Sequence, residues 1–243
     1  MSITNTASGT SIDEVADGIF RISTPVAPPG LPGGFTFNQF LILDEAPLLF
    51  HTGPRRIFPL TREAIATVID PAQLRYIGFS HHEADENGAL LEFLDFALEA
   101  SPVCGKIAAM VSVSDMTDRP VTALADGQTL SLGKHTLRWL DTPHLPHAWE
   151  CGYLFDETTK TLLCGDLFTQ PGTGMAAITE GDILGPSEAM RSAMEYYAHS
   201  SNTGALLDKL IALQPTTLAP MHGSAWRGDG AGLLTELKAK LLA

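Results

Sequence analysis

The sequence predicts an α/β protein in which two mixed β-sheets face each other and helices cover the outer faces. Strand-rich segments are followed by a helix–strand–helix segment, and this order occurs twice along the 243 residues. No change in composition divides the chain, and no repeat of 20–50 residues is visible as identity. A hydrophobic content of 44% with 18% charged residues is ordinary for a globular protein. We therefore expect a single domain spanning residues 1–243.

The first half begins with the polar residues 1–17, which we expect to be a short flexible lead. They lack the basic and apolar regions of a secretory signal. The strands predicted next are 18–23, a hairpin over 35–53 with its turn at 44–47, and 74–79. Between the first two lies PVAPPGLPGG (25–34), whose Pro and Gly content indicates an exposed loop. One-sided apolar spacing predicts helices over 61–69 and within 87–102.

The second half repeats this order with longer strands. Strands are predicted over 103–111, 128–143 and 151–168, and the last of these folds into a hairpin around 157–160. Helices follow over 187–200 and 203–215, then a strand over 216–220 and a terminal helix over 232–243.

Composition excludes several classes of function. The net charge of −13 argues against nucleic-acid binding, which needs a basic surface. No apolar run approaches the roughly 18 residues of a membrane span. The three cysteines, Cys104, Cys151 and Cys164, show no CxxC spacing, so neither a disulfide framework nor a zinc knuckle is expected. We expect a cytoplasmic protein without nucleic-acid or membrane partners.

Residues of the metal-ligand type follow four apolar strands. If the strands are roughly parallel within their sheets, these side chains emerge at one edge and converge there. A single loop histidine or turn aspartate would carry little weight, but four such strand ends together favour a metal site. The candidates are His81, Glu83, Asp85, His144, Asp166 and His222.

The other histidines are interpreted differently. His82 points away from His81 if the segment is extended, so we do not expect it to be a ligand. For His51, His135 and His199 a structural role is expected.

The segment HHEADENG (81–88) resembles the HxHxDH signature of the metallo-β-lactamase superfamily, with His82 at a spacer position. It resembles more closely the HxExD form of flavodiiron proteins, which are oxygen and nitric oxide reductases with a lactamase-like domain. PHLPH resembles their HWPD segment, with His144 at the ligand position, and LLCGDLF resembles the strand of their bridging aspartate.

Two further segments extend the resemblance. LAPMHGSAWRG is similar to the SHGxxWR segment of flavodiiron proteins and contains His222, Trp226 and Arg227. EYYAH resembles their Tyr-Tyr-Ala helix. The resemblance covers about Gly18 to Arg227 and implies the αββα four-layer sandwich of the metallo-β-lactamase fold.

The resemblance implies a centre of two metal ions bridged by Asp166 and a hydroxide or oxo group. It assigns His81, Glu83 and His144 to the first ion, and Asp85 and His222 to the second. Mixed histidine and carboxylate ligation favours non-haem iron, with zinc or manganese as the alternatives. Glu83, which replaces a histidine of the hydrolase signature, is the residue that favours iron and oxygen chemistry.

The chain departs from the flavodiiron pattern at several positions. Glu86 replaces the histidine after the motif aspartate, and we interpret it as an additional ligand or as a hydrogen-bond partner of a ligand. The loop 28–34 lacks the histidine that lies near the substrate in flavodiiron proteins. Tyr196 or Tyr197 is the remaining candidate proton donor, and His147 a candidate partner of the ligands or an added pocket group.

A further departure concerns the source of electrons. We expect no flavodoxin domain and no flavin in this chain, so electrons would come from a separate flavoprotein or rubredoxin-like donor. Stand-alone domains of this kind are oxygen-binding diiron proteins, and the leading hypothesis is a diiron protein that binds or reduces O2, or NO, for scavenging or sensing. The oligomeric state is left open.

Two alternatives remain. A dinuclear metallo-hydrolase would attack an ester, lactone, thioester or phosphodiester through a metal-bound hydroxide. A sensor would respond to O2 by moving the loop 28–34 or the QPGTGM loop (170–175) against a partner.

Overall fold

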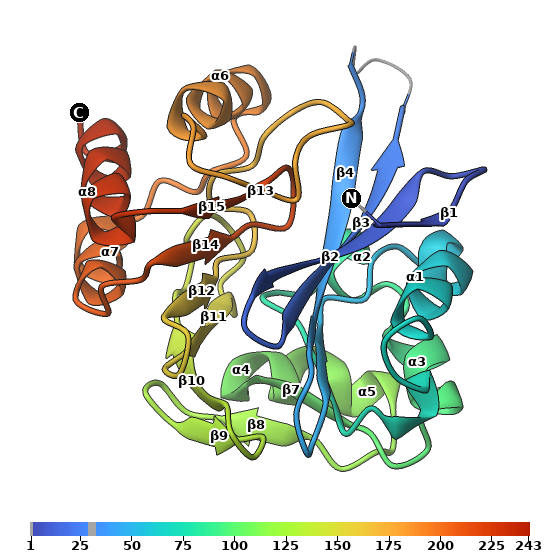
Figure 1. Ribbon diagram of the computed structural model, residues 1–243. Helices are drawn as coiled ribbons and strands as arrows, with labels where there is room; N and C mark the ends of the chain where they lie inside the picture. The colour runs from blue at the N-terminus through green and yellow to red at the C-terminus, as the bar shows by residue number, and fades with distance from the viewer. Residues whose placement is uncertain (1, 29–32) are drawn as a thin grey trace.

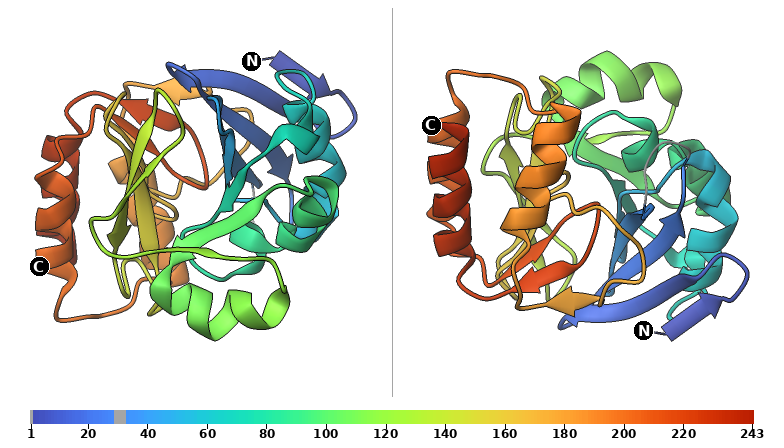
Figure 2. Two further views of the ribbon diagram at one scale, coloured as in Figure 1. Left: turned by 90° about the horizontal axis from the view of Figure 1, so that it is seen from below. Right: turned by 90° about the horizontal axis from the view of Figure 1, so that it is seen from above.

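Two β-sheets form the centre of the computed structural model, and helices cover the outer face of each (Figure 1). The structure describes residues 2–28 and 33–243, so part of the expected loop 25–34 lies outside the described residues. The four layers are visible from both ends of the molecule (Figure 2). The αββα sandwich expected from the sequence is thereby confirmed.

The first sheet contains, among the described residues, eight strands in sequence order. The pairs from β1–β2 to β4–β5 are antiparallel, whereas the pairs from β5–β6 to β7–β8 are parallel. The strands are β1 (Ser2–Asn5), β2 (Thr10–Ala16), β3 (Ile19–Val26), β4 (Phe35–Ile42), β5 (Leu48–Phe50), β6 (Tyr76–Gly78), β7 (Ser101–Gly105) and β8 (Thr122–Leu124).

The second sheet has the order β13-β15-β14-β12-β11-β10-β9 over the same part of the chain. Its strands are β9 (Thr129–Ser131), β10 (Thr136–Asp141), β11 (Gly152–Asp156), β12 (Thr161–Leu163), β13 (Ile178–Thr179), β14 (Thr217–Ala219) and β15 (Ala225–Arg227). The predicted hairpin around 157–160 is present as β11 and β12.

The helices divide between the two outer faces. Those of the first half are α1 (Phe58–Ile65), α2 (Ala84–Asn87), α3 (Leu90–Phe96), α4 (Lys106–Ala108) and α5 (Ser114–Met116), with short turns η1 (Arg55–Ile57), η2 (Pro71–Gln73) and η3 (Ala109–Val113). Those of the second half are α6 (Leu184–Met194), α7 (Thr203–Ile211) and α8 (Gly230–Leu241). Within the described residues, no helix is long and apolar enough to cross a membrane.

Three sequence expectations are corrected. The lead 1–17 contains two strands in its described part, since β1 and β2 pair with each other and β2 pairs with β3. The predicted strand 103–111 ends at Gly105, and helical turns follow from Lys106 to Met116. The helix expected over 187–200 is α6, which ends at Met194, so both tyrosines lie in the loop after it.

Apolar packing holds the layers together. Leu207 and Leu210 of α7 and Leu234 and Leu237 of α8 pack on the outer face of the second sheet. Between the sheets lies a separate apolar cluster whose largest member is Trp139, fully buried on β10. All three cysteines are free and buried.

Two glycines pack closely against the indole ring of Trp139. A Cβ atom added at Gly152 would overlap the Trp139 indole ring and lie 2.8 Å from the carbonyl oxygen of Leu140. The ring is flanked on β7 by Gly105, where an added Cβ would lie 3.0 Å from it. Small residues on the neighbouring strands are therefore required by the size of the indole.

We expect Gly152→Ala to lower the free energy of unfolding by roughly 1–3 kcal/mol, because a buried backbone and a rigid ring cannot both move aside. Gly181→Ala is the matched control, since its nearest neighbour is the Thr179 hydroxyl at 3.3 Å and the residue is exposed. Urea unfolding of both variants checks this, and equal stability of the two variants would contradict it.

Candidate metal centre

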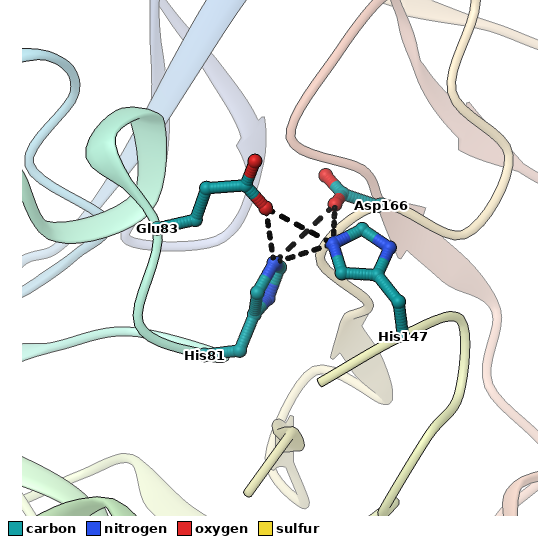
Figure 3. Close-up of side chains that lie close together, drawn as sticks. All are labelled: His81, Glu83, His147 and Asp166. Atoms are coloured by element: carbon teal, nitrogen blue, oxygen red, sulfur yellow. Dashed lines mark hydrogen bonds and ion pairs between the residues drawn. The ribbon is translucent and has the colours of Figure 1, made fainter. Parts of the chain in front are cut away.

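The candidate centre lies where strand ends from both sheets meet. Strands β10, β12 and β14 run in the same direction, because β10 and β12 are both antiparallel to β11 and β12 is parallel to β14. The loops after these three strands carry His147, Asp166 and His222. The segment after β6 of the first sheet brings His81 and Glu83 to the same place (Figure 3).

Four side chains form the first ligand group: His81, Glu83, His147 and Asp166. The Nε2 atom of His81 lies 2.9 Å from Nε2 of His147 and 3.2 Å from Oε2 of Glu83. Oδ2 of Asp166 lies 3.6 Å from Nε2 of His81 and 3.5 Å from Nε2 of His147. Four ligands at about 2.0–2.1 Å from a tetrahedral ion would be about 3.3 Å apart, so this spacing fits one metal ion.

The second ligand group consists of Asp85 and Glu86 on α2 and His222 after β14. Nε2 of His222 lies 3.4 Å from Oδ2 of Asp85 and 3.3 Å from Oδ1 of Asp166. The two oxygens of Asp166 thus face different groups, Oδ2 toward the first and Oδ1 toward the second. This is the arrangement of a carboxylate shared by two ions.

Glu86 is the most exceptional side chain of the centre. It is fully buried, and no group among the described residues lies in hydrogen-bonding geometry to either of its oxygens. Burial, together with the neighbouring charge of Asp166, raises the pKa of Glu86 well above its usual range. A buried carboxylate without partners is costly unless it is neutralised, and a metal ion would neutralise it.

The histidines compensate this negative charge when no metal is bound. Burial lowers the pKa of His222, but hydrogen bonds with Asp166 and Asp85 outweigh burial and raise it to about 9. Burial likewise opposes the charging of His81, whereas the charge of Glu86 raises its pKa well above the ordinary value. The site therefore attracts positive charge, as protons or as metal ions.

The ring of His222 is fixed by the first sheet. Its Nδ1 donates a hydrogen bond to the carbonyl oxygen of Thr36 at 2.8 Å, and its Nε2 thereby faces the two aspartates. The ring of Phe35 stacks on it with centroids 4.0 Å apart. A histidine whose second nitrogen donates to a carbonyl is the usual form of a metal ligand.

The loop that carries His222 is held by two buried polar side chains. Arg21 on β3 donates from Nε and Nη2 to the carbonyl oxygen of Gly223, at 3.1 and 2.7 Å. Asn38 on β4 donates to the carbonyl oxygens of Pro220 and Gly223 at 2.9 and 2.8 Å. Strands of one sheet therefore position a ligand supplied by the other.

A cavity of about 170 Å³ opens onto both groups. Its remaining walls are Phe35, Thr169, Met190, Met194 and Tyr196. A small apolar molecule could enter such a cavity and meet the ligand atoms.

The structure distinguishes the two tyrosines. Tyr196 lines the cavity, and its hydroxyl donates to the carbonyl oxygen of Asp166 at 3.4 Å. Burial raises the pKa of Tyr196 above its ordinary value, so its hydroxyl keeps its proton at physiological pH. Tyr197 instead packs into the apolar cluster under α7 and α8 and does not line this cavity.

The expectation for His144 is corrected. His144 is exposed and belongs to neither ligand group, whereas His147 lies at the centre of the first. The reason is the course of the loop after β10. The backbone N–H of His144 donates to the carbonyl oxygen of Ala148, and this tight turn leaves His144 outside while directing His147 inward.

The structure brings together the other five expected ligands and also Glu86. His82 faces away, as expected, and its Nδ1 lies 2.8 Å from the amide nitrogen of Asn87. His135 is paired with Asp156, with Nδ1 2.9 Å from Oδ2. No motif in the sequence marks Thr36, Phe35, Arg21 or Asn38, which contact His222 or its loop from the first sheet.

Comparisons with known proteins show the family of the chain. Residues 35–223 match the family model described as ODP family beta lactamase. The chain is 31% identical over 209 residues to a rubredoxin-oxygen oxidoreductase of Megalodesulfovibrio gigas, covering 81% of this chain and 50% of that protein. It is 28% identical over 208 residues to a nitric oxide reductase of Moorella thermoacetica, covering 81% and 51%. The chain thus spans about half the length of these relatives.

Solved structures show the same fold. The rubredoxin oxygen:oxidoreductase from Desulfovibrio gigas superposes with a TM-score of 0.78 at 25% identity, covering 94% of this chain and 60% of that one. A metal-soaked Flv1 flavodiiron core from Synechocystis gives a TM-score of 0.82 at 22% identity, covering 96% and 60%. The family model matches most of the chain, at residues 35–223, and the fold is that of the relatives. The chain therefore belongs to the ODP family of metallo-β-lactamase-like domains.

Proposed function

We propose that this protein holds two iron ions and binds or reduces O2, with NO as a second substrate. The observation that carries the proposal is the position of Asp166, whose two oxygens face the two ligand groups at 3.3–3.6 Å from their histidines. The names of the relatives, an oxygen oxidoreductase and a nitric oxide reductase, support the same chemistry.

In the proposed assignment, each group holds one ion and Asp166 serves both. His81, Glu83 and His147 complete the first set. Asp85, Glu86 and His222 complete the second. Glu86 therefore has the role of a ligand, because its two oxygens are buried and accept no hydrogen bond from the described residues, and Oε2 lies only 3.9 Å from Nε2 of His81.

The donor set favours iron over zinc. It contains three imidazoles and four carboxylates, and no cysteine belongs to either group. Mixed imidazole and carboxylate ligation suits iron, and four negative charges balance two divalent ions. When bound, the iron pair would supply electrons to dioxygen.

The surrounding residues prepare the cavity for this reaction. Phe35, Met190 and Met194 make one side apolar, which suits an uncharged diatomic ligand and limits the water that enters. Tyr196 holds a proton on its hydroxyl oxygen at the cavity wall. We propose that electrons come from a separate flavoprotein or rubredoxin-like protein, as the name of one relative implies for that relative.

The first prediction tests the ligand assignment. His147→Ala should weaken metal binding at the first group by more than the roughly 10–100-fold that loss of a ligand's hydrogen-bond partner costs. His144→Ala lies on the same loop and removes the same ring from an exposed position. Chelator competition should give it wild-type affinity. Weakened metal binding in His144→Ala, with wild-type affinity in His147→Ala, would show that His144 is the ligand.

The second prediction concerns stability against pH in the metal-free protein. An unfolded histidine has a pKa near 6.5, whereas the folded pKa of His222 is about 9. A raised folded pKa gives stability that is present below 6.5 and is lost as the pH rises through 9. We expect a loss of roughly 3 kcal/mol, or about 6–12 °C in Tm.

Thermal unfolding in the presence of a chelator, from pH 6 to pH 9.5, checks this sign. His222→Gln cannot take up the proton, so it should remove much of the decline. A Tm that stays level or rises over this range in the wild-type protein would contradict the charge balance described for the centre.

The third prediction tests the function. Protein loaded with ferrous iron without air, then freed of excess iron, should consume O2 and gain near-ultraviolet ligand-to-metal absorption on exposure to air. Asp166→Asn should abolish both effects, because it removes the charge of the shared ligand.

Asp156→Asn is the matched control for this test, since Asp156 is also a buried aspartate but pairs with His135 instead. It should behave as the wild type. Absence of O2 consumption by the loaded wild-type protein would refute the proposal. Hydrolysis of an ester or lactone panel in its place would favour the hydrolase alternative.

A further inference from the structure

His51, a buried histidine outside the two ligand groups, lies behind His81 of the first group. His51 follows β5 and is fully buried, and its Nε2 lies 3.0 Å from the hydroxyl oxygen of Ser80. The same oxygen lies 3.0 Å from Nδ1 of His81. The three side chains form a chain of hydrogen bonds that ends on the nitrogen of His81 opposite to the one facing the candidate metal.

The direction of these hydrogen bonds follows from the donors available. If Nε2 of His81 offers its lone pair to a metal, its proton resides on Nδ1 and is donated to Ser80. The hydroxyl of Ser80 then donates to Nε2 of His51, which must be unprotonated at that atom. Burial lowers the pKa of His51 to about 3, so the ring is neutral at physiological pH and can accept.

His51 occupies its place at a cost that simple packing does not explain. Its φ angle is +64°, in the left-handed region that residues with side chains rarely adopt. Its Nδ1 is buried and has no hydrogen-bond partner among the described residues. An uncommon backbone conformation and an unpaired Nδ1 thus occur at the residue whose Nε2 contacts Ser80, and strained backbone of this kind clusters at functional sites.

Ser80 is held firmly between the two rings. Its carbonyl oxygen accepts a hydrogen bond from the backbone N–H of Gly152 at 2.8 Å, which ties it to the second sheet. The thiol of Cys151 also lies beside His81, but it donates to the carbonyl oxygen of Leu145 at 3.2 Å, and sulfur is a weak acceptor. Ser80 is therefore the effective acceptor for the Nδ1 proton.

We propose that Ser80 and His51 are positioning residues that fix the tautomer and the ring orientation of His81, with His51 as the terminal acceptor. This inference rests on the proposed metal centre, and it revises the structural role expected for His51. This arrangement differs from that of His222, whose Nδ1 donates to a backbone carbonyl oxygen. A carbonyl oxygen can always accept, whereas Nε2 of His51 accepts only in the tautomer that is protonated at Nδ1. The geometry of a ligand thereby depends on the protonation pattern of a residue that does not contact the metal.

Zinc, which is diamagnetic, is a suitable probe of this relay. In zinc-loaded protein with ¹⁵N-labelled histidine, NMR should show His81 protonated at Nδ1 and His51 protonated at Nδ1 with a bare Nε2. Protonation of His51 at Nε2 in this sample would overturn the proposal, and this measurement needs no variant.

Variants test the relay by affinity. Ser80→Ala and His51→Phe should each weaken zinc binding, measured by chelator competition, by about 10–100-fold. His51→Gln should retain most of the affinity, because its side-chain carbonyl can accept from Ser80. Ser80→Ala combined with His51→Phe should lose little more than Ser80→Ala alone, since both break the same chain of bonds.

His135→Gln is the control for loss of a buried histidine. His135 directly precedes β10, whereas the His147 loop follows the opposite end of that strand. This control should keep wild-type affinity, and near-ultraviolet circular dichroism should show that each variant is folded. Wild-type affinity in folded Ser80→Ala and His51→Phe would overturn the relay. These zinc measurements are independent of O2 consumption, so the relay can stand where the oxygen chemistry fails. A wild-type protein that binds no zinc would overturn the relay together with the metal centre.

Discussion

Negative charge gathered at the strand ends is the constraint on which the centre depends. Glu83, Asp85, Glu86 and Asp166 lie beside one another, and two of them are almost completely buried. Such a cluster is stable only if positive charge enters it. In the metal-free protein the histidines supply that charge by holding protons, which explains the raised pKa values of His81 and His222. Two metal ions would replace those protons, so the same electrostatics that destabilise the empty site would favour metal binding.

The sandwich makes this cluster by assembling it from two halves that are each incomplete. The first sheet and α2 supply His81, three of the carboxylates and the carbonyl oxygen that orients His222. The second sheet supplies His147, Asp166 and His222 itself. Arg21 and Asn38 hold the loop of His222 from the opposite sheet. The two ligand groups therefore lie next to each other only when the sheets are packed together. Apolar packing around Trp139 maintains that relation.

Much of this could be predicted from the sequence because strand ends carry their own signals. Apolar runs followed by histidines and carboxylates located five of the residues that meet in the two candidate ligand groups, and the alternate spacing separated His81 from His82. The choice between His144 and His147 depended on a turn closed by the carbonyl oxygen of Ala148, and three residues of loop give no periodicity from which to predict it. The pairing of β1 and β2 was also missed, because a polar strand at a sheet edge resembles a flexible lead. His51 is a further case, since only the fold shows that it lies behind Ser80.

The central claim is that two irons share Asp166, with His147 and Glu86 among their ligands. A crystal structure of the iron-loaded protein, with anomalous diffraction recorded on both sides of the iron absorption edge, tests this most directly. We expect two iron peaks on either side of the Asp166 carboxylate, one in contact with Nε2 of His147 and the other with an oxygen of Glu86. A single peak, or a peak in contact with His144 while His147 is free, would contradict the claim.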